Sequence, residues 1–457
     1  MTNNIDFSKY HTALENIDTL EYAGRVTKIV GLAVEASGPA SKIGDVCEMH
    51  TLDGERIIRA EIVGFRDGST LLMPFGSVEG IGLGSYVKYT GVSLRVPVGK
   101  ELTGRILDAL GNPFDDLPQP KIDTWYPADN MPPNPLSRER IHEVLPLGIK
   151  AIDSMLTVGR GQRLGIFSGS GVGKSTLLGM IARYAVADVN VIVLVGERGR
   201  EVRDFVERDL GEDGLRKSVL VIATSDQPAL LRLKCAMTGT AIAEYFRDCG
   251  YKVLLLMDSL TRFAMAQREI GMAAGEPPVS RGFPPSVYTI LPKLLERSGM
   301  SDKGSITGLY TVLVEGDDLN EPISDTVRGI LDGHIVLSRA IANSNHYPPI
   351  DILGSVSRVM PDIISQEHFE MFGVFKNMIA VYREAEDLIN IGAYKKGANP
   401  EIDRAVQLHP AIQSFLRQGV PEHYTFDETL DMMAGIVERG ELRVEVDRRG
   451  KKGEQGY

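Results

Sequence analysis

The 457-residue sequence contains only three cysteines, Cys47, Cys235 and Cys249, and no CxxC pair. This scarcity excludes a disulfide framework and a cysteine-based zinc site, and it favours a reduced, cytosolic protein. The eight histidines form neither an HExxH motif nor a close cluster, so a histidine metal site is not expected either.

Long apolar runs are also missing. The longest runs, among them Val191–Val195 and Val253–Met257, have five residues, whereas a membrane-spanning helix needs about 20. The first residues, Met1–Asp6, lack the basic and apolar regions of a secretory signal. We therefore expect a cytoplasmic protein that associates with a membrane only peripherally.

Basic residues are in the minority, with 50 Lys and Arg against 61 Asp and Glu and a net charge of −11. Proteins that bind nucleic acids usually carry a basic face, so no specific nucleic-acid partner is expected. The chain is 43% hydrophobic and 24% charged, which is typical of a soluble globular protein. At ~150 residues per domain, its length predicts roughly two to four domains.

The first part of the chain divides into a helix and a β-domain. Within residues 1–22, Phe7, Tyr10, Leu14 and Ile17 fall on one face of a helix. This helix either packs on the protein's own next domain or docks on a partner. Residues 23–95 hold short β-rich runs between Gly, Asp and Ser turns, which predict a small β-barrel.

The rest of the chain shows two sequence patterns. Residues 96–362 include a Pro-rich linker and then alternate apolar strands with helix-like stretches, which predicts a parallel sheet covered by helices. Residues 363–457 have a helical apolar period and end in a basic tail, which predicts a C-terminal helical domain.

A glycine-rich segment follows the predicted strand Arg163–Phe167 and precedes a predicted helix. It resembles a phosphate-binding loop, although the first position of that pattern is usually Gly and is Ser here. In such a loop the backbone N–H groups and the helix N-terminus hold phosphates, the lysine reaches the β- and γ-phosphates, and the following hydroxyl ligates Mg²⁺. The segment therefore predicts a site for ATP and Mg²⁺, formed by Ser168, Gly169, Ser170, Gly171, Val172, Gly173, Lys174, Ser175 and Thr176.

Two further strands end in carboxylates. The apolar strand Val253–Met257 ends in Asp258, a Walker B pattern that would help to hold Mg²⁺. The strand Val191–Val195 leads to Glu197. Because parallel strands end at one edge of a sheet, Glu197 is predicted to reach a water near the γ-phosphate. The alternative is a surface salt-bridge cluster of Glu197 with nearby arginines.

These motifs resemble the family of rotary ATPase catalytic subunits and type III secretion ATPases. The resemblance rests on Gly169–Thr176, Gly196–Glu201, Asp258–Arg262 and Gly282–Ser286, and it covers nearly the whole chain. It implies an α/β fold, with a RecA-like parallel-sheet ATPase core between an N-terminal β-barrel and a C-terminal helical domain.

The resemblance also implies roles for single residues. Glu197 matches the catalytic carboxylate, Tyr347 matches the aromatic residue that stacks on adenine, and Arg358 matches the arginine that enters a neighbouring subunit's site. Such a head-to-tail contact closes into a ring, for which the family implies six subunits. Whether Arg358 acts within its own chain or across the interface stays open, as does an intrachain salt bridge for it.

Within the family the sequence is most similar to the flagellar protein-export ATPases. The stretch Asp387–Gly397 lacks the acidic run of rotary subunits and resembles the secretion branch. The implied function is ATP hydrolysis that drives export of unfolded proteins at the cytoplasmic face of a membrane export apparatus. The implied partners are export-gate and stalk proteins, unfolded cargo, and a regulator or stator protein at residues 1–22. The alternatives are an injectisome ATPase, a rotary catalytic subunit, an RNA helicase ring and a non-hydrolysing nucleotide binder.

Overall fold

The computed structural model describes residues 22–38, 41–314, 316 and 318–438. The predicted docking helix, apart from Tyr22, and the basic tail lie outside these ranges. The chain divides into two compact units, one that holds residues 1–95 with two short later segments and one that holds almost all the rest. No helix within the described ranges is long and apolar enough to cross a membrane.

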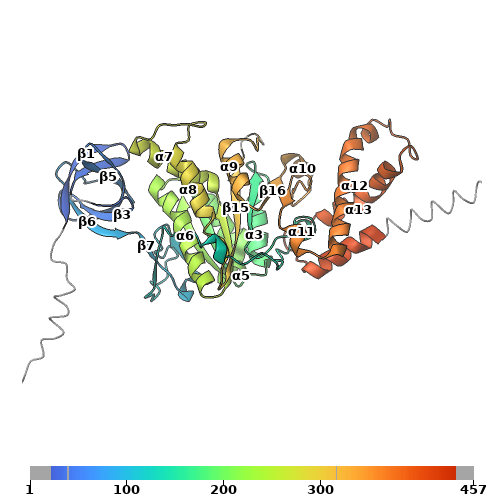
Figure 1. Cartoon of the computed structure of the whole chain (residues 1–457), viewed down its shortest axis with the longest axis horizontal. Helices are drawn as coiled ribbons and strands as arrows, with labels where there is room; N and C mark the ends of the chain where they lie inside the picture. The colour runs from blue at the N-terminus through green and yellow to red at the C-terminus, as the bar shows by residue number, and fades with distance from the viewer. Residues whose placement is uncertain (1–21, 39–40, 315, 317, 439–457) are drawn as a thin grey trace, which may run out of the picture. The chain divides into compact units, whose positions relative to one another are not determined.

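The first unit is a closed antiparallel barrel, whose strands are drawn in blue in Figure 1. Alternate side chains such as Val34, Cys47 and Ile62 point inward and are fully buried. Closure leaves no strand edge open to pairing with another chain. Around the barrel the strands are β1 (Ala23–Val30), β2 (Ala33–Ser37), β5 (Ser69–Pro74), β4 (Ile57–Arg66), β3 (Asp45–His50) and β6 (Tyr86–Ser93).

The second unit is built on a nine-stranded sheet. Its central strands are apolar along almost their whole length, as expected for parallel strands covered on both faces. In spatial order the strands are β17 (Val356–Ser357), β16 (Gly333–Leu337), β10 (Arg163–Ser168), β15 (Ser305–Leu313), β13 (Lys252–Asp258), β11 (Val189–Glu197), β12 (Ser218–Thr224) and β8 (Ile106–Asp108), with β14 (Gly299–Met300) on β15. Only β14 and β17 pair antiparallel, so the other seven strands end at one carboxyl edge.

Helices follow most of these strands. They are α2 (Lys150–Met155), α3 (Lys174–Tyr184), α4 (Gly199–Asp204), the π-helical turn η3 (Phe205–Leu210), α5 (Gly211–Arg216), α6 (Ala229–Asp248), α7 (Leu260–Ala274), α8 (Pro285–Leu295), α9 (Pro322–Ile330), α10 (Arg339–Asn343) and α11 (Met360–Ile363). The linker between barrel and sheet carries β7 (Arg95–Pro97), β9 (Trp125–Pro127) and the short 3-10 helices η1 (Lys100–Leu102) and η2 (Pro135–Ser137).

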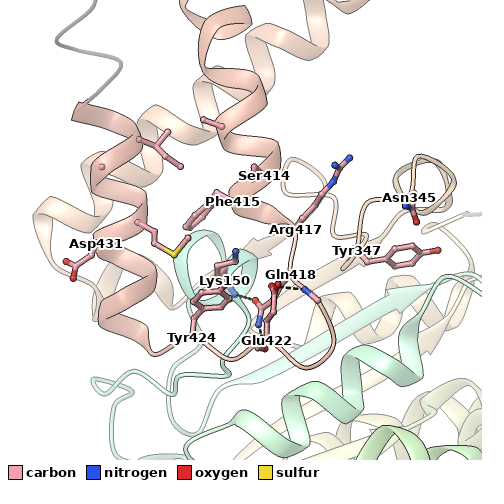
Figure 2. A pocket seen from close by; sticks show the side chains of 15 residues that line it. Lys150, Asn345, Tyr347, Ser414, Phe415, Arg417, Gln418, Glu422, Tyr424 and Asp431 are labelled. Atoms are coloured by element: carbon pink, nitrogen blue, oxygen red, sulfur yellow. Dashed lines mark hydrogen bonds between the residues drawn. The ribbon is translucent and has the colours of Figure 1, made fainter.

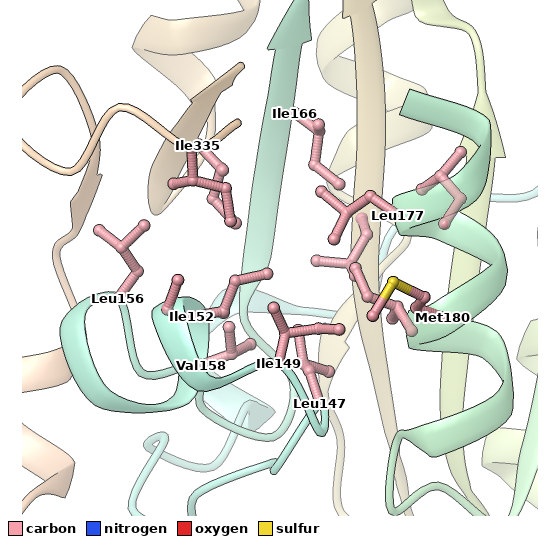
Figure 3. Close-up of a cluster of buried hydrophobic side chains, with 14 of the residues drawn as sticks. Leu147, Ile149, Ile152, Leu156, Val158, Ile166, Leu177, Met180 and Ile335 are labelled. Carbon is pink, nitrogen blue, oxygen red and sulfur yellow. The ribbon is translucent and has the colours of Figure 1, made fainter. Parts of the chain in front are cut away.

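The C-terminal helices share the core of the nine-stranded sheet. They are α12 (Gln366–Asn390), α13 (Pro400–Leu416) and a helix over residues 426–438. Phe375 and Phe415 belong to the same buried cluster as residues of α2, α3 and β10. Figure 3 shows part of this cluster, where Ile152, Ile166 and Leu177 meet. The predicted fold of barrel, parallel-sheet core and C-terminal helices is thus confirmed.

A buried ion pair connects α6 with the residue Arg297 that follows α8, and a hydrogen bond from the same arginine reaches the linker. The guanidinium of Arg297 donates to both carboxylate oxygens of Glu244, at 2.9 and 2.8 Å, and to the carbonyl of Ala128 at 2.8 Å. Both side chains are almost completely buried. Removing one partner would therefore leave the other charge without compensation in the core.

We expect Arg297→Met to lower the free energy of unfolding by about 3–5 kcal/mol, because Glu244 stays buried without its cation. Denaturant unfolding followed by circular dichroism measures this loss. The double variant Arg297→Met with Glu244→Leu should recover much of the lost free energy of unfolding. An equal loss in the single and the double variant would show that the unpaired charge of Glu244 is not the cause.

Candidate active site

The glycine-rich segment forms a loop between β10 and α3, at the carboxyl edge of the sheet. Gly171 and Gly173 have φ angles of 76° and 90°, in the left-handed region that favours glycine. This conformation lets successive backbone N–H groups turn toward a bound anion. Ser168 still lies in β10, where it is buried and pairs with Leu313 and Leu337. A strand residue needs no glycine, so the departure from the usual pattern leaves the loop intact.

The other predicted loop residues have distinct surroundings. Val172 is buried and anchors the loop in the core. The carbonyl of Ser170 accepts a hydrogen bond from Arg339 at 3.0 Å. Thr176 forms a hydrogen bond with Asp209, so its side chain is used within the protein.

Lys174, Glu197 and Asp258 come together at the carboxyl edge. The Lys174 ammonium donates a short hydrogen bond to Asp258 and lies 3.8 Å from Glu197 Oε1. Thr311 on β15 donates to the same Asp258 oxygen at 2.7 Å. The parallel pairing of β11 with β13 sets this arrangement, since Leu194 is opposite Asp258. One ammonium thus compensates two carboxylates.

Glu197 has a perturbed acidity. Burial raises its pKa from 4.5 to about 7, and the negative charge of Asp258 adds to the shift, while the positive charges of Lys174 and Arg262 oppose it. Its Oε1 atom has no hydrogen-bond partner among the described residues. A carboxylate that ionises near neutral pH can accept a proton from water.

The donors at this edge fit a magnesium ion. Ser175 is in the first turn of α3 and supplies a hydroxyl, and Asp258 supplies a carboxylate. Magnesium is usually held by one or two such oxygens together with the phosphates of the substrate. The described residues contain no group of three or more His, Cys, Asp or Glu that would bind a metal without the nucleotide.

Tyr347 lies beside the phosphate loop. A Cβ atom at Gly173 would be 3.6 Å from Tyr347 Cε1, although the two residues are far apart in sequence. The side chain is 45% exposed, which leaves a ring face available to a base. Tyr347 also borders a pocket of about 890 Å³ between its loop and the C-terminal helices, which Figure 2 shows from close by.

Arg358 lies at the opposite edge of the sheet. Its backbone N–H donates to Asp332 and its guanidinium to the carbonyl of Leu331, at 3.0 and 3.3 Å. Both acceptors precede β16, whose other end, Leu337, pairs with Ser168 beside the phosphate loop. The five residues of β16 separate these ends by roughly 17 Å. Arg358 is exposed and forms no ion pair with any described residue, so the intrachain salt bridge is not found.

Sequence reasoning did not find three residues of this region. Arg262 packs its side chain on Gly196, directly before Glu197. Thr311 orients Asp258, and Gln418 donates its backbone N–H to the carbonyl of Tyr347 at 2.9 Å. A polar threonine within an apolar strand was a usable signal for Thr311. No sequence signal connects Gln418 with Tyr347, because their contact depends on the docking of α13.

Comparison with known proteins finds relatives of all three parts of the chain. Residues 148–357 match the nucleotide-binding domain of the ATP synthase alpha/beta family, residues 26–91 match its beta-barrel domain, and residues 364–435 match the T3SS EscN ATPase C-terminal domain. The flagellum-specific ATP synthase of Bacillus subtilis is 53% identical over 93% of this chain and 97% of its own length. The type 3 secretion system ATPase of Xanthomonas euvesicatoria is 50% identical over 91% and 94%.

Two solved structures of a secretion ATPase are also similar to this chain. The assembled ATPase EscN of the enteropathogenic E. coli type III secretion system has a TM-score of 0.86 and 46% identity, over 91% of this chain and all of the other. EscN in complex with its central stalk EscO has a TM-score of 0.84 and 45% identity over the same shares.

We expect Glu197→Gln to stabilise the nucleotide-free protein at alkaline pH. Because the folded-state pKa of Glu197 is raised, its contribution to stability is present below pH 4.5 and is lost as pH rises through about 7. Denaturant unfolding should therefore give the variant a free energy of unfolding roughly 1–3 kcal/mol higher than that of wild type at pH 8. The difference in this free energy should be much smaller at pH 5. Glu212→Gln, on the exposed start of α5, is the control and should show no such pH dependence. A pH-independent difference for Glu197→Gln would contradict the shifted pKa.

Proposed function

The chain belongs to the ATP synthase alpha/beta family, in the branch of flagellum-specific and type III secretion ATPases, and we propose that it hydrolyses Mg-ATP to drive protein export through a flagellar apparatus. The observation that carries the proposal is the cluster of Lys174, Glu197 and Asp258 beside the phosphate loop. A nucleoside triphosphate needs a cation such as Lys174, its metal needs a carboxylate such as Asp258, and the attacking water needs a base such as Glu197.

In the proposed reaction, the loop from Gly169 to Thr176 holds the phosphates of ATP, and Lys174 leaves Asp258 to bind the β- and γ-phosphates. Ser175 and Asp258 would hold Mg²⁺, which would supply positive charge to the γ-phosphate. Glu197 then accepts the proton of the attacking water. Tyr347 stacks on adenine, an interaction worth roughly 1–3 kcal/mol for a base on an aromatic ring.

Arg358 completes the site of a neighbouring subunit. Its position beyond the far end of β16, together with its lack of an ionic partner in the described ranges, supports a role at another chain's site. A head-to-tail contact of this kind repeats until a ring closes. We propose a ring of six subunits, and the assembled state of the similar EscN supports the oligomer.

The proposed partners are those expected for a flagellum-specific or type III secretion ATPase. The complex of EscN with its stalk EscO supports a stalk protein. We further propose an export gate and unfolded cargo as partners, a regulator or stator protein at residues 1–22, and a location at the cytoplasmic face of the membrane.

An injectisome ATPase is the second candidate, because relatives of both kinds have similar identities. A rotary catalytic subunit is disfavoured, since residues 364–435 match the C-terminal domain of a secretion ATPase. Proteins that copurify with the chain from its native cells distinguish flagellar from injectisome machinery.

We expect Glu197→Gln to lower kcat by about 10²–10⁴, the usual contribution of a positioned base. ATP binding should persist, because the phosphate loop is unchanged. Steady-state phosphate release and equilibrium titration with ATP measure the two quantities. Unchanged turnover would support the non-hydrolysing nucleotide binder instead.

Arg358→Ala should lower kcat by about 10³ or more, because the transferring phosphoryl group loses its compensating cation. The control is Arg216→Ala on α5, which removes another exposed arginine and should leave kcat unchanged. Arg358→Lys keeps the charge but loses the planar fork, so we expect only partial activity. Full activity of Arg358→Ala would remove this residue from the mechanism.

A further inference from the structure

Gln418 is a buried polar residue that the proposed reaction does not use. It follows α13 and is only 4% exposed. Its Oε1 accepts the backbone N–H of Lys150 at 2.8 Å, and its Nε2 donates to the carbonyls of Gly148 at 2.8 Å and Glu422 at 3.0 Å. Figure 2 shows the side chain among these partners, below Phe415. Both amide donors and one acceptor site are thus satisfied by backbone groups.

The backbone of Gln418 reaches a third segment. Its N–H donates to the carbonyl of Tyr347 at 2.9 Å. The residue before that tyrosine, His346, is also buried and forms hydrogen bonds with Gln413 and with the backbone of Leu416. The C-terminal helical segment therefore holds residues 346 and 347 at two points.

These contacts act together with the pairing of Pro349 and Ile350 to the end of β16, which holds the other side of this segment. The Tyr347 ring is nearly half exposed and lies at van der Waals distance from the position of a Cβ at Gly173. Its distance from the phosphate loop therefore depends on where its backbone is held. Gln418 links that backbone to Gly148 and Lys150, at the start of α2, which leads directly into β10 and the loop.

We propose that Gln418 is a positioning residue for the adenine subsite. Its side chain docks the end of α13 on the Gly148–Lys150 turn, and its backbone then sets the gap between Tyr347 and the phosphate loop that admits a purine. Binding of the base therefore requires the C-terminal helices to be docked, whereas binding of phosphates does not. The inference rests on the proposed role of Tyr347 in stacking on adenine.

The test compares the Gln418→Glu variant with the wild-type protein, both at full length. The substitution keeps the acceptor for Lys150. It replaces the amide nitrogen by a carboxylate oxygen, which is repelled by the carbonyl oxygens of Gly148 and Glu422. The control Gln366→Glu adds the same charge at the exposed start of α12. Calorimetric titrations with ADP and with inorganic pyrophosphate separate binding at the base from binding at the phosphates.

We expect Gln418→Glu to weaken ADP binding about tenfold, which lies within what a base stacked on an aromatic ring contributes, and to change the pyrophosphate Kd less than about twofold. The control should change neither. Adding Tyr347→Ala to Gln418→Glu should cost little more, because both changes remove the same stacking contact. Gln418→Ala, which removes the donors without adding charge, should behave in the same way and covers the case in which the charged variant fails to fold.

Equal weakening of ADP and pyrophosphate would mean that Gln418 only supports the fold, and unchanged ADP binding would overturn the proposal outright. Failure of the proposed function itself looks different: the wild-type protein would then bind neither ADP nor pyrophosphate, or would bind both and release no phosphate from ATP.

Discussion

The parallel register of the central strands places two carboxylates and one ammonium group at the carboxyl edge of the sheet. It leaves Arg358 at the opposite, amino edge. β10, β11 and β13 end together, so the residues at or after their ends, Lys174, Glu197 and Asp258, meet within hydrogen-bond or ion-pair distance. The same register puts the start of β16 one strand length from the phosphate loop. This position supports our proposal that a second copy of the chain supplies the arginine that completes the charges around a triphosphate.

The charge balance of the nucleotide-free edge is consistent with a site that binds anions and a metal. Two carboxylates share the single ammonium of Lys174, and the pKa of Glu197 is raised as a result of burial and of the neighbouring Asp258. In the proposed reaction, the phosphates of ATP would attract Lys174 away from Asp258, and that carboxylate would then be free to hold Mg²⁺. One strand-end cluster thus accounts for both the unusual acidity of Glu197 and its proposed use as a base.

The long elements could be predicted from the sequence and the short ones could not, for physical reasons. The strands around Val191–Val195 and Val253–Met257 were recognisable because a buried parallel strand is apolar throughout. Short strands such as β8 and β17, with three and two residues, carry too little pattern to be read. The phosphate loop and the two strand-end carboxylates were predictable from local motifs. The bond of Gln418 to Tyr347 was not, since it joins segments about 70 residues apart through tertiary packing alone.

The shared site is tested most directly by mixing two inactive variants. Lys174→Ala lacks the phosphate-binding amine, Arg358→Ala lacks the cation offered to the neighbour, and each alone should be nearly inactive. If subunits exchange randomly, one site in about four joins an intact Lys174 to a neighbour's intact Arg358, so the mixture should recover roughly a quarter of wild-type turnover. No recovery in mixed assemblies, verified by differently labelled subunits, would contradict the account.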